Sequence, residues 1–343
     1  MRIIIAHSHL NTFGGGERAV LELMQRLSVR HDVTLWAGNY APTDTFAEFA
    51  DLARRDISTL GWLTASPQAD AIVTHTFGAN LLALHHPHTI CYLHSLRSVY
   101  ARGGRRPDLA LRRILERRAL RKASAILTNS AFSAELARQL YGLRLDVLSL
   151  GADEPLLALP PRLGSYALYV GRLAPEKGLE RLLAWSCDLP IDLKIVGRGE
   201  RGYVSYLHSL AGPRATFCGA LTGPDLAAAY AGCRYFVFLP HDEEFGLAAL
   251  DALATSKPVI AAREGGLIEL VRDGENGFLV GTAEEFALAS SRLIADGALC
   301  LQMGARAHED AQAYSWDSYT RAIEARCVSA NADTMPSMGV ACL

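Results

Sequence analysis

Short apolar runs alternate along this chain with stretches that have the periodicity of a helix. In the first half these runs are rich in β-branched residues and predict strands: RIIIA (2–6), DVTLWA (32–37), AIVTH (71–75), TICYLH (89–94), AILTN (125–129) and DVLSL (146–150). The second half repeats the pattern with YALYVG (166–171), DLKIVG (192–197), ATFCG (215–219), YFVFLP (235–240), PVIAA (258–262) and GFLV (277–280). Helical periods in the first half lie at 16–28, about 44–54, about 107–122 and 131–140. Strands that alternate with helices are typical of an α/β protein with parallel sheets.

The two sets of strands predict two Rossmann-like, doubly wound domains. Segment 151–165, GADEPLLALPPRLGS, is rich in Gly and Pro and reads as the linker between them. We expect the first domain at residues 1–155, the second at 156–313 and a flexible tail at 331–343. A helical pattern at about 314–330 is a candidate to pack back onto the first domain. Ligands of such domains bind at the carboxyl ends of the strands, which we expect to face a central cleft.

Composition narrows the class of protein. Of the 343 residues, 50% are hydrophobic and 20% are charged, which is typical of a soluble globular protein. The seven cysteines, an odd number without a C-x-x-C motif, favour reduced thiols over disulfides or a zinc site. The start, MRIIIAH, reads as a strand, and no run approaches the roughly 20 apolar residues of a membrane helix. We therefore expect a cytoplasmic protein.

Positive charge is concentrated in one segment. The net charge of −2 gives no reason to expect a nucleic-acid partner, but between Arg97 and Lys122 ten Lys or Arg stand against Asp108 and Glu116, a local charge of +8 (10 − 2). Within it, residues 106–122 have apolar positions at helical spacing. Two interpretations stay open: a solvated face of an amphipathic helix, and a peripheral contact of 97–122 with an anionic membrane surface.

Two loops at predicted strand ends suit anions. After the first strand, Gly14, Gly15 and Gly16 lie where a helix begins, so the backbone could approach a ligand and offer N–H groups. After the first strand of the second half, GRLAPEKG (171–178) carries Arg172 and Lys177 just before a helix, and two cations there suit a diphosphate. The structural alternatives are a plain tight turn and a solvated pair of cations.

A third such loop follows YFVFLP. Phe245, Gly246 and Leu247 would offer N–H groups at the start of a helix, and Glu243 precedes that helix. Asp251 lies on the same helix among Ala and Leu, so we expect it to accept hydrogen bonds from hydroxyls or amides. The alternative is a partly exposed acid on a surface helix.

One motif points to a different chemistry. IVGRGERG (195–202) matches G-x-G-x-x-G and keeps an NAD(P)-dependent oxidoreductase open as an alternative. The acid expected about 20 residues later has no clean strand-end candidate. We therefore favour a loop around Gly197 that borders a nucleotide base.

The sequence offers little to a metal ion. It contains no D-x-D motif, so we expect neither a metal nor another cofactor. HHPH (85–88) is predicted to be a loop rather than a metal site, because no cysteine or acid cluster is near.

These pieces, in this order, resemble the retaining, metal-independent glycosyltransferases of family 4, which have the two-domain GT-B fold. The resemblance covers about residues 1–330 and is most specific over PHDEEFGLAALDALATSKPVIAAREGGLIELVRDGENGFLV (240–280). GRLAPEKG (171–178), GGGER (14–18), CYLHSLR (91–97) and TNSAFSAEL (128–136) also match. GGGER is similar in addition to mannosyltransferases that act on lipid-linked acceptors.

The resemblance implies catalytic roles for four residues. Arg172 and Lys177 would hold the donor diphosphate, and Glu243 would contact hydroxyls of the transferred sugar. His94 matches the family's active-site histidine, near the transferred sugar and the acceptor. Without the family match, a histidine satisfied inside a loop is the better interpretation of His94.

The resemblance also implies a donor-binding set, in which Asp251 would bind the ribose hydroxyls. Its members are Gly15, Gly16, Gly197, Phe245, Gly246, Leu247 and Asp251. The chain departs from the family pattern at three positions. Asp251 replaces the usual Glu and shortens its reach by about one C–C bond, ~1.5 Å. Ser256 stands where a Gly commonly ends the helix, and Leu96 replaces a common Pro.

The resulting hypothesis is a retaining hexosyltransferase. It would move a hexose from a nucleotide-diphosphate sugar, GDP-mannose or a UDP-sugar, to an acceptor hydroxyl, with a lipid-linked glycan at the inner face of a membrane as the candidate acceptor. The alternatives are the NAD(P)-dependent oxidoreductase, a non-catalytic nucleotide-sugar binder, and a synthase or phosphorylase of a soluble sugar.

Overall fold

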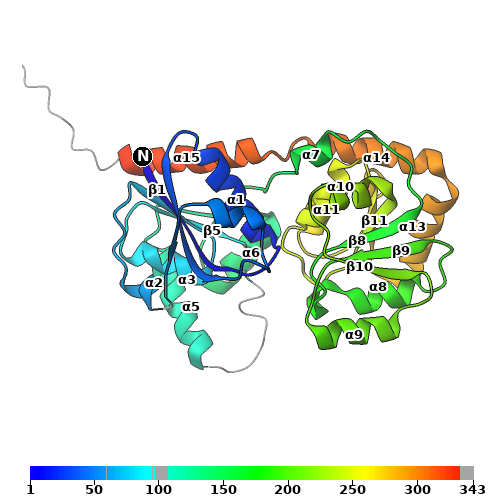
Figure 1. The fold of residues 1–343 in the computed structure, drawn as a ribbon, viewed down its shortest axis with the longest axis horizontal. Helices are drawn as coiled ribbons and strands as arrows, with labels where there is room; N and C mark the ends of the chain where they lie inside the picture. Colours follow the sequence, from blue (N-terminus) through cyan, green and yellow to red (C-terminus); the bar gives the residue numbers. More distant parts are fainter. Residues whose placement is uncertain (59, 95, 97–106, 333–343) are drawn as a thin grey trace, which may run out of the picture. The chain divides into compact units, whose positions relative to one another are not determined.

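The computed structural model describes residues 1–58, 60–94, 96 and 107–332. The chain divides into two compact units (Figure 1). The first comprises Met1–Asn129, Ser133–Ser149 and the chain from Asp317 onward, and the second comprises Ser130–Phe132 and Leu150–Trp316. Each unit is built on one parallel sheet with helices packed against it, as the alternating pattern of the sequence predicts.

The first unit holds a seven-stranded sheet in the order β3-β2-β1-β4-β5-β6-β7. Every neighbouring pair is parallel. The strands are β1 (Arg2–Leu10), β2 (Asp32–Tyr40), β3 (Arg54–Asp56), β4 (Ala71–Thr74), β5 (Thr89–Leu93), β6 (Ala125–Thr128) and β7 (Asp146–Val147). The strand order reverses between β1 and β4. From β1 the chain adds β2 and β3 on one side, and it then adds β4 to β7 on the other side of β1.

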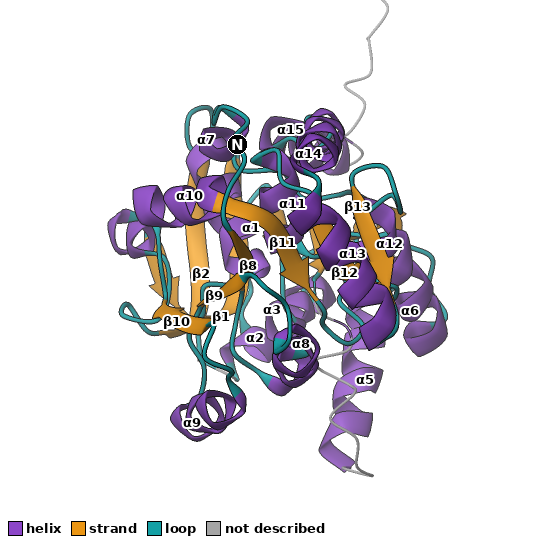
Figure 2. Cartoon of the chain, turned by 90° about the vertical axis from the view of Figure 1, so that its right-hand side faces the viewer, coloured by secondary structure: helices purple, strands orange, loops and turns teal. Residues whose placement is uncertain are grey.

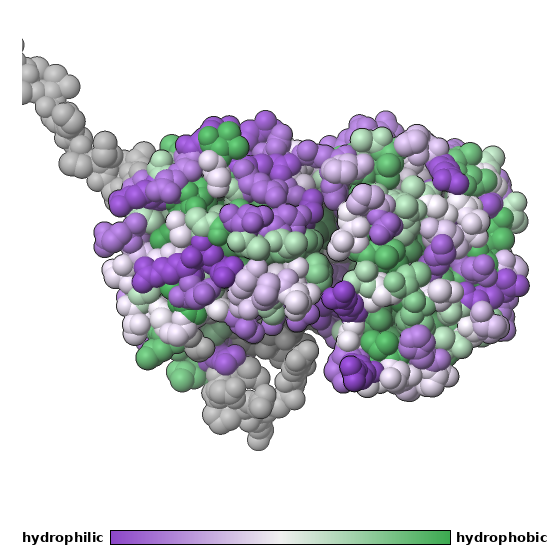
Figure 3. Space-filling model, in the orientation of Figure 1, coloured by the Kyte–Doolittle hydropathy of each residue, from purple (hydrophilic) through white to green (hydrophobic). Residues whose placement is uncertain are grey.

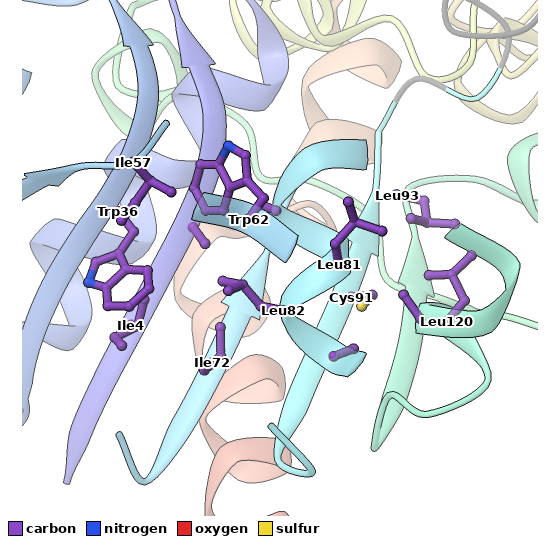
Figure 4. Close-up of a cluster of buried hydrophobic side chains, with 14 of the residues drawn as sticks. Ile4, Trp36, Ile57, Trp62, Ile72, Leu81, Leu82, Cys91, Leu93 and Leu120 are labelled. Carbon is purple, nitrogen blue, oxygen red and sulfur yellow. The ribbon is translucent and has the colours of Figure 1, made fainter. Parts of the chain in front are cut away.

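Helices cover both faces of this sheet. They are α1 (Gly15–Leu27), α2 (Gly61–Thr64), α3 (Phe77–Asn80), α5 (Pro107–Leu120), α6 (Ala131–Tyr141) and α15 (Trp316–Ala332), with the 3₁₀ helices η1 (Ala47–Asp51) and η2 (Leu81–Leu84). On one face, side chains from β1, β2, β4 and β5 pack against α2, η2 and α5 in a buried apolar cluster (Figure 4). Trp36 and Trp62 are the largest members of this cluster. Burial of this apolar surface is the main stabilising term of the unit.

The C-terminal helix α15 belongs to the opposite face. Tyr92 points away from the apolar cluster because side chains alternate along β5, and its ring contacts that of Tyr319 edge-on. Two contacts hold α15 near the end of α1: Arg26 forms an ion pair with Asp317 at 2.9 Å, and the Nε2 of His31 lies within hydrogen-bond distance of the Glu324 carboxylate, at 2.7 Å.

The predicted helix at 44–54 is wrong. Only the short 3₁₀ helix η1 forms there, and the chain then adds the edge strand β3. Arg54 stacks over the ring of Tyr40 at 3.7 Å and Arg55 over that of Trp36 at 4.9 Å. These cation–π contacts and the pairing with β2 stabilise a strand where the local sequence favours a helix.

The second unit holds a six-stranded parallel sheet in the order β10-β9-β8-β11-β12-β13, drawn in orange in Figure 2. The strands are β8 (Tyr166–Val170), β9 (Asp192–Val196), β10 (Ala215–Gly219), β11 (Cys233–Phe238), β12 (Val259–Ala262) and β13 (Gly277–Val280). All six lie where the sequence predicts strands. The order again reverses once, between β8 and β11.

Neighbouring helices of the second unit contact one another. They are α7 (Glu154–Leu157), α8 (Leu179–Ser186), α9 (Arg201–Leu210), α10 (Gly223–Gly232), α11 (Leu247–Ala254), α12 (Leu267–Leu270), α13 (Ala283–Ala295) and α14 (Gly297–Ala311), with the 3₁₀ helix η3 (Pro175–Lys177). Trp185 of α8 packs against Phe286 of α13, and Tyr230 of α10 donates a hydrogen bond to the Ala248 carbonyl of α11.

On the visible face of each unit, hydrophilic and hydrophobic residues are interspersed (Figure 3). None of the helices in the described part of the chain has the length and apolar character that crossing a membrane requires.

Helix α11 ends in a Schellman motif that lacks its usual glycine. The N–H of Lys257 donates to the Ala252 carbonyl and that of Ser256 to the Leu253 carbonyl, both at 3.0 Å. Ser256 takes the left-handed conformation that this motif requires, with φ of 57°. Its buried hydroxyl has no hydrogen-bond partner among the described residues. The departure from the family's glycine therefore keeps the glycine's backbone geometry.

Replacing Ser256 by glycine should stabilise the protein. A left-handed residue with a Cβ costs roughly 1–2 kcal/mol, and part of this gain is offset by the flexibility of glycine in the unfolded chain. We expect Ser256→Gly to raise the free energy of unfolding by about 1 kcal/mol, measured by urea and thermal unfolding. Ser256→Ala is the matched control, because it removes the hydroxyl but keeps the Cβ. A glycine variant no more stable than the alanine variant would contradict the strain at this position.

Candidate functional site

In each sheet the side chains that could bind a ligand or take part in a reaction lie where the strand order reverses. Such reversals leave a crevice outside the carboxyl ends of two neighbouring strands, where ligands of open α/β sheets bind. In the second unit the reversal lies between β8 and β11, and in the first unit between β1 and β4. The two groups of residues are described separately below.

The loop after β8 places Lys177 with the help of one glycine. Lys177 ends the 3₁₀ helix η3, and Gly178 follows with φ of 66° as the N-cap of α8. A Cβ at Gly178 would lie 1.8 Å from the carbonyl oxygen of Leu239, which follows β11. Only glycine allows this close approach, so Gly178 fixes the loop that carries Lys177 to the end of β11.

Lys177 and Glu243 form an ion pair at this point. The Lys177 Nζ lies 2.5 Å from the Glu243 Oε2, and each side chain is only 16% exposed. The ammonium group also lies 5.6 Å from the ring centroid of Phe238. The sequence predicts both residues for the site but not their direct contact. A half-buried cation with one carboxylate partner retains hydrogen-bonding capacity for an anionic ligand.

Arg172 is more exposed than Lys177. It contacts Glu176 at 3.1 Å within the same loop, and both side chains are more than two-fifths exposed. Burial acts to raise the pKa of Glu176, but its backbone hydrogen bond and the charges of Arg172 and Lys177 outweigh burial and lower it. Arg172 is therefore an exposed cation on this loop, and its partner Glu176 stays ionised.

The loop that carries Glu243 is fixed by backbone contacts with Gly265 and Gly266. The N–H of Gly266 donates to the Glu243 carbonyl at 2.7 Å. A Cβ at Gly265 would lie 2.3 Å from the same carbonyl oxygen, and one at Gly266 would lie 2.2 Å from that of Glu244. These two glycines, part of the motif quoted above, thus let the loop after β12 lie against the loop after β11.

Arg181 also holds this loop, and the sequence analysis missed it. From α8 its guanidinium donates to the carbonyls of Leu239 at 2.7 Å and Pro240 at 2.6 Å, and to the Glu264 carboxylate at 2.8 Å. One side chain therefore ties α8 to the ends of β11 and β12. The only signal in the sequence is a cation one turn into a predicted helix, which reads as ordinary solvated surface.

The N-terminus of α11 is open. Gly246 is its N-cap with φ of 94°, and within the described part of the chain no side chain caps this helix. Leu247 is its first residue, and Phe245 is buried with its ring edge-on to Tyr314. The first N–H groups of α11 keep their capacity for an acceptor, and an anion is the acceptor that a helix N-terminus favours.

Asp251 lies in the middle of α11 and is partly buried. Burial, followed by the charge of Asp251, raises the pKa of Tyr230 well above its usual value. The hydroxyl of Tyr230 donates a hydrogen bond to the Ala248 carbonyl, on the same helix as Asp251. Its role toward a ribose stays a prediction.

The G-x-G-x-x-G segment is built differently from a dinucleotide site. Glu200 caps α9, and its carboxylate accepts from the N–H groups of Gly202 at 3.0 Å and Tyr203 at 3.1 Å. These hydrogen bonds lower the pKa of Glu200, so a fixed negative charge occupies the place where a pyrophosphate would bind. A Cβ at Gly197 would lie 1.9 Å from the Gly171 carbonyl oxygen, which explains the glycine by the close approach of β9 to the β8 end.

In the first unit, Gly15 and Gly16 begin α1, with Gly14 as the N-cap. A Cβ at Gly16 would lie 3.4 Å from the Nε2 of His7 and 3.8 Å from the ring of His94. Gly16 and His94, which are distant in the sequence, are therefore neighbours at the carboxyl ends of β1 and β5.

Two further histidines, His7 and His75, lie close to His94, a third, His9, contacts His7, and the sequence analysis missed all three. His7 and His9 lie in the last part of β1, and His75 directly follows β4. The Nδ1 of His75 lies 2.7 Å from the Nε2 of His94. The ring centroid of His75 lies 6.5 Å from that of His7 and 5.0 Å from that of His94. The available signal was that three of the strand-forming runs end in, or are followed at once by, a histidine.

These imidazoles are neutral at neutral pH. Burial lowers the pKa of His94 to about 3. Burial first, and then the neighbouring histidines, lower the pKa values of His7 and His75 well below the usual range. The cluster therefore offers neutral donors and acceptors of hydrogen bonds rather than positive charge.

In the other histidine-rich segment, HHPH (85–88), two histidines make hydrogen bonds to backbone carbonyls of the same unit. The Nε2 of His85 contacts the Leu63 carbonyl and that of His86 the Ala69 carbonyl. Across the described residues, no group of three His, Cys, Asp or Glu side chains is arranged to hold a metal ion.

Each of the two units matches the model of a known glycosyltransferase family. The family described as Glycosyltransferase Family 4 matches residues 13–154, and that described as Glycosyl transferases group 1 matches residues 163–310. The structure of Anabaena HepE in complex with UDP superposes with a TM-score of 0.81 at 22% identity, and covers 96% of this chain and 100% of that one. The predicted GT-B fold is confirmed by this similarity.

Two curated relatives match shorter regions. The GDP-mannose-dependent alpha-mannosyltransferase of Corynebacterium glutamicum is 38% identical over 152 residues, which are 44% of this chain and 36% of the relative. The D-inositol 3-phosphate glycosyltransferase of Rhodococcus opacus is 28% identical over 263 residues, which are 67% of this chain and 58% of the relative. The matches thus span between about one third and three fifths of these relatives.

Removing the Arg181 guanidinium should loosen the loop after β11. We expect Arg181→Met to leave two carbonyls and Glu264 without their donor, and to destabilise the second unit by about 2–3 kcal/mol. Hydrogen exchange should rise first in residues 239–246. Arg214→Met is a matched control, because the side chain of Arg214 is exposed and pairs with the exposed Asp192. Equal exchange in both variants would show that Arg181 does not hold the loop.

Proposed function

Because this chain belongs to the family 4 glycosyltransferases with the GT-B fold, we propose that it is a retaining hexosyltransferase that uses a nucleotide-diphosphate sugar. The observation that carries this proposal is the group at the β8/β11 reversal: the Lys177–Glu243 pair beside the open N-terminus of α11. A half-buried cation and unpaired helix N–H groups are suited to diphosphate oxygens. The adjacent carboxylate is suited to sugar hydroxyls.

In this proposal the protein itself neutralises the leaving group. Arg172, Lys177 and the first N–H groups of α11 would stabilise the diphosphate as the sugar–phosphate bond breaks, in the place that a metal ion takes in other transferases. Glu243 would bind hydroxyls of the transferred sugar. The Lys177 ammonium would contact Glu243 and the donor phosphate at the same time. Asp251 would bind the ribose, Gly197 would border the base, and Gly15 and Gly16 would lie by the phosphates and the acceptor.

Retention at the anomeric carbon would follow from attack on the face that the phosphate leaves. The acceptor oxygen forms the new bond to the anomeric carbon while the bond to the phosphate oxygen breaks, and the departing phosphate takes the acceptor's proton. This step needs no carboxylate nucleophile. His94 would lie near the transferred sugar and the acceptor, as a neutral imidazole.

The donor is proposed to be GDP-mannose or a UDP-hexose. One relative is named as GDP-mannose-dependent, and HepE is named in complex with UDP. A thermal-shift screen with GDP-, UDP- and ADP-sugars and with NAD(H) would separate these donors from one another. Stabilisation by NAD(H) alone would favour the oxidoreductase alternative.

Loss of Lys177 should impair turnover far more than folding. We expect Lys177→Ala to lower kcat for donor consumption by about 100-fold or more, since one fixed donor to a developing charge contributes a factor of this order. Lys177→Arg should recover part of this loss. Arg214→Ala, the exposed control, should keep full activity. Undiminished transfer by Lys177→Ala, in a protein of normal thermal stability, would reject the assignment.

We also propose that α5 contacts an anionic membrane surface, which would bring the enzyme to a lipid-linked acceptor at the cytoplasmic face. Leu111 and Ile114 are exposed on this helix, at 58% and 56%, although both are apolar. Exposed arginines flank them at 112, 113, 117 and 118. Residues 97–106 of the predicted membrane segment lie outside the described residues. Apolar side chains among cations are typical of a helix that lies in a membrane interface.

The membrane contact can be tested by sedimentation with vesicles. We expect the protein to bind vesicles of phosphatidylglycerol and phosphatidylcholine at low salt and to dissociate at high salt, since each cation near the surface contributes about 1 kcal/mol. A variant with both Leu111→Ser and Ile114→Ser should bind more weakly. Leu288→Ser is the matched control, because Leu288 is 65% exposed in the second unit. A wild-type protein that stays in the supernatant would exclude this contact.

A further inference from the structure

His75 is a buried histidine whose two ring nitrogens have different surroundings. It follows β4 and is only 1% exposed. Its Nδ1 lies 2.7 Å from the Nε2 of His94, whereas its Nε2 has no hydrogen-bond partner among the described residues. Its ring neighbours include His7 and Tyr92, with centroids at 6.5 Å and 5.5 Å.

Two neutral imidazoles that share one hydrogen bond have two arrangements of their protons. In the first, the Nδ1–H of His75 donates to the Nε2 of His94, so that His94 carries its proton on Nδ1. In the second, the Nε2–H of His94 donates to the Nδ1 of His75, and His75 then carries its proton on Nε2. Both rings are neutral, because burial lowers both pKa values.

The unpartnered Nε2 of His75 decides between these arrangements. In the first arrangement this buried atom is an unused acceptor, and in the second it is an unused donor. A buried N–H without an acceptor is the rarer and costlier defect in folded proteins. The first arrangement is therefore favoured, and it leaves the proton of His94 on Nδ1.

We propose that His75 is a positioning residue that fixes His94 as the Nδ1–H tautomer, so that His94 donates a hydrogen bond to a substrate oxygen instead of acting as a base. The role toward substrate rests on the proposed function, whereas the tautomer does not. His94 is only partly buried, so a ligand can reach its ring. A donor at this position also agrees with a transfer in which the leaving phosphate, not the protein, takes the acceptor's proton.

The tautomer can be measured in the protein without substrate. In protein labelled with ¹⁵N-histidine, long-range ¹H–¹⁵N correlation distinguishes protonated from unprotonated ring nitrogens, and His94→Gln identifies the signals of His94. We expect a protonated Nδ1 and an unprotonated Nε2 in His94. A protonated Nε2 in His94 would overturn the proposal, whatever reaction the protein catalyses.

Substitutions at His75 test its effect on turnover. Asn places an N–H donor close to the position of the imidazole Nδ1, so His75→Asn should retain the tautomer and keep kcat within about threefold. His75→Leu removes the donor and should lower kcat by about tenfold or more, with little change in the KM for the donor, because the hydrogen bond acts in the transition state.

The NMR spectrum and the thermal stability of His75→Asn show whether the fold is kept. Equal kcat values for the Asn and Leu variants would reject the positioning role. If no nucleotide sugar is turned over at all, the proposed function fails, and the spectrum of the wild-type protein still decides the tautomer.

Discussion

The single reversal of strand order in each sheet is the constraint on which the rest of this structure depends. All strands of a parallel sheet end at the same edge, so a reversal leaves a crevice that no crossover helix fills. Residues that are distant in the sequence meet there because their strands end side by side. Lys177 follows β8 and Glu243 follows β11, and they are in contact although 66 positions separate them. In the first unit, the ends of β1, β4 and β5 bring together His7, His75 and His94 in the same way.

Most of the strands could be predicted from the sequence because their signal is local. A run of β-branched residues predicts a buried strand without knowledge of its neighbours. The position of Lys177, Glu243 and the start of α11 followed for the same reason, since each lies just after such a run. The edge strand β3 could not be predicted, because it depends on stacking of Arg54 and Arg55 on aromatic rings of β2.

The missed site residues depend on contacts that no local pattern reveals. Arg181 gains its importance from carbonyls almost 60 residues later. His75 looks like an isolated strand-end residue until β4 and β5 are placed next to one another. The cap of α9 shows the converse: G-R-G-E-R-G matches a nucleotide motif, but its own glutamate already occupies the N–H groups that the motif would offer. The open start of α11 and the closed start of α9 differ by one carboxylate, which is why only the start of α11 is proposed as an anion site.

The attachment of α15 to α1 has a consequence for how the protein is made. The first unit is discontinuous, because its last helix follows the entire second unit in the chain. During synthesis, the face of the first sheet around Tyr92 therefore stays uncovered until residues 317 onward have left the ribosome, whereas the second unit has all six of its strands well before then. At the usual rate of about 5–20 residues per second, the ribosome needs roughly ten to thirty seconds to add that intervening length. In that interval the first unit exposes apolar surface that α15 later buries, and such transiently exposed surface is prone to aggregation.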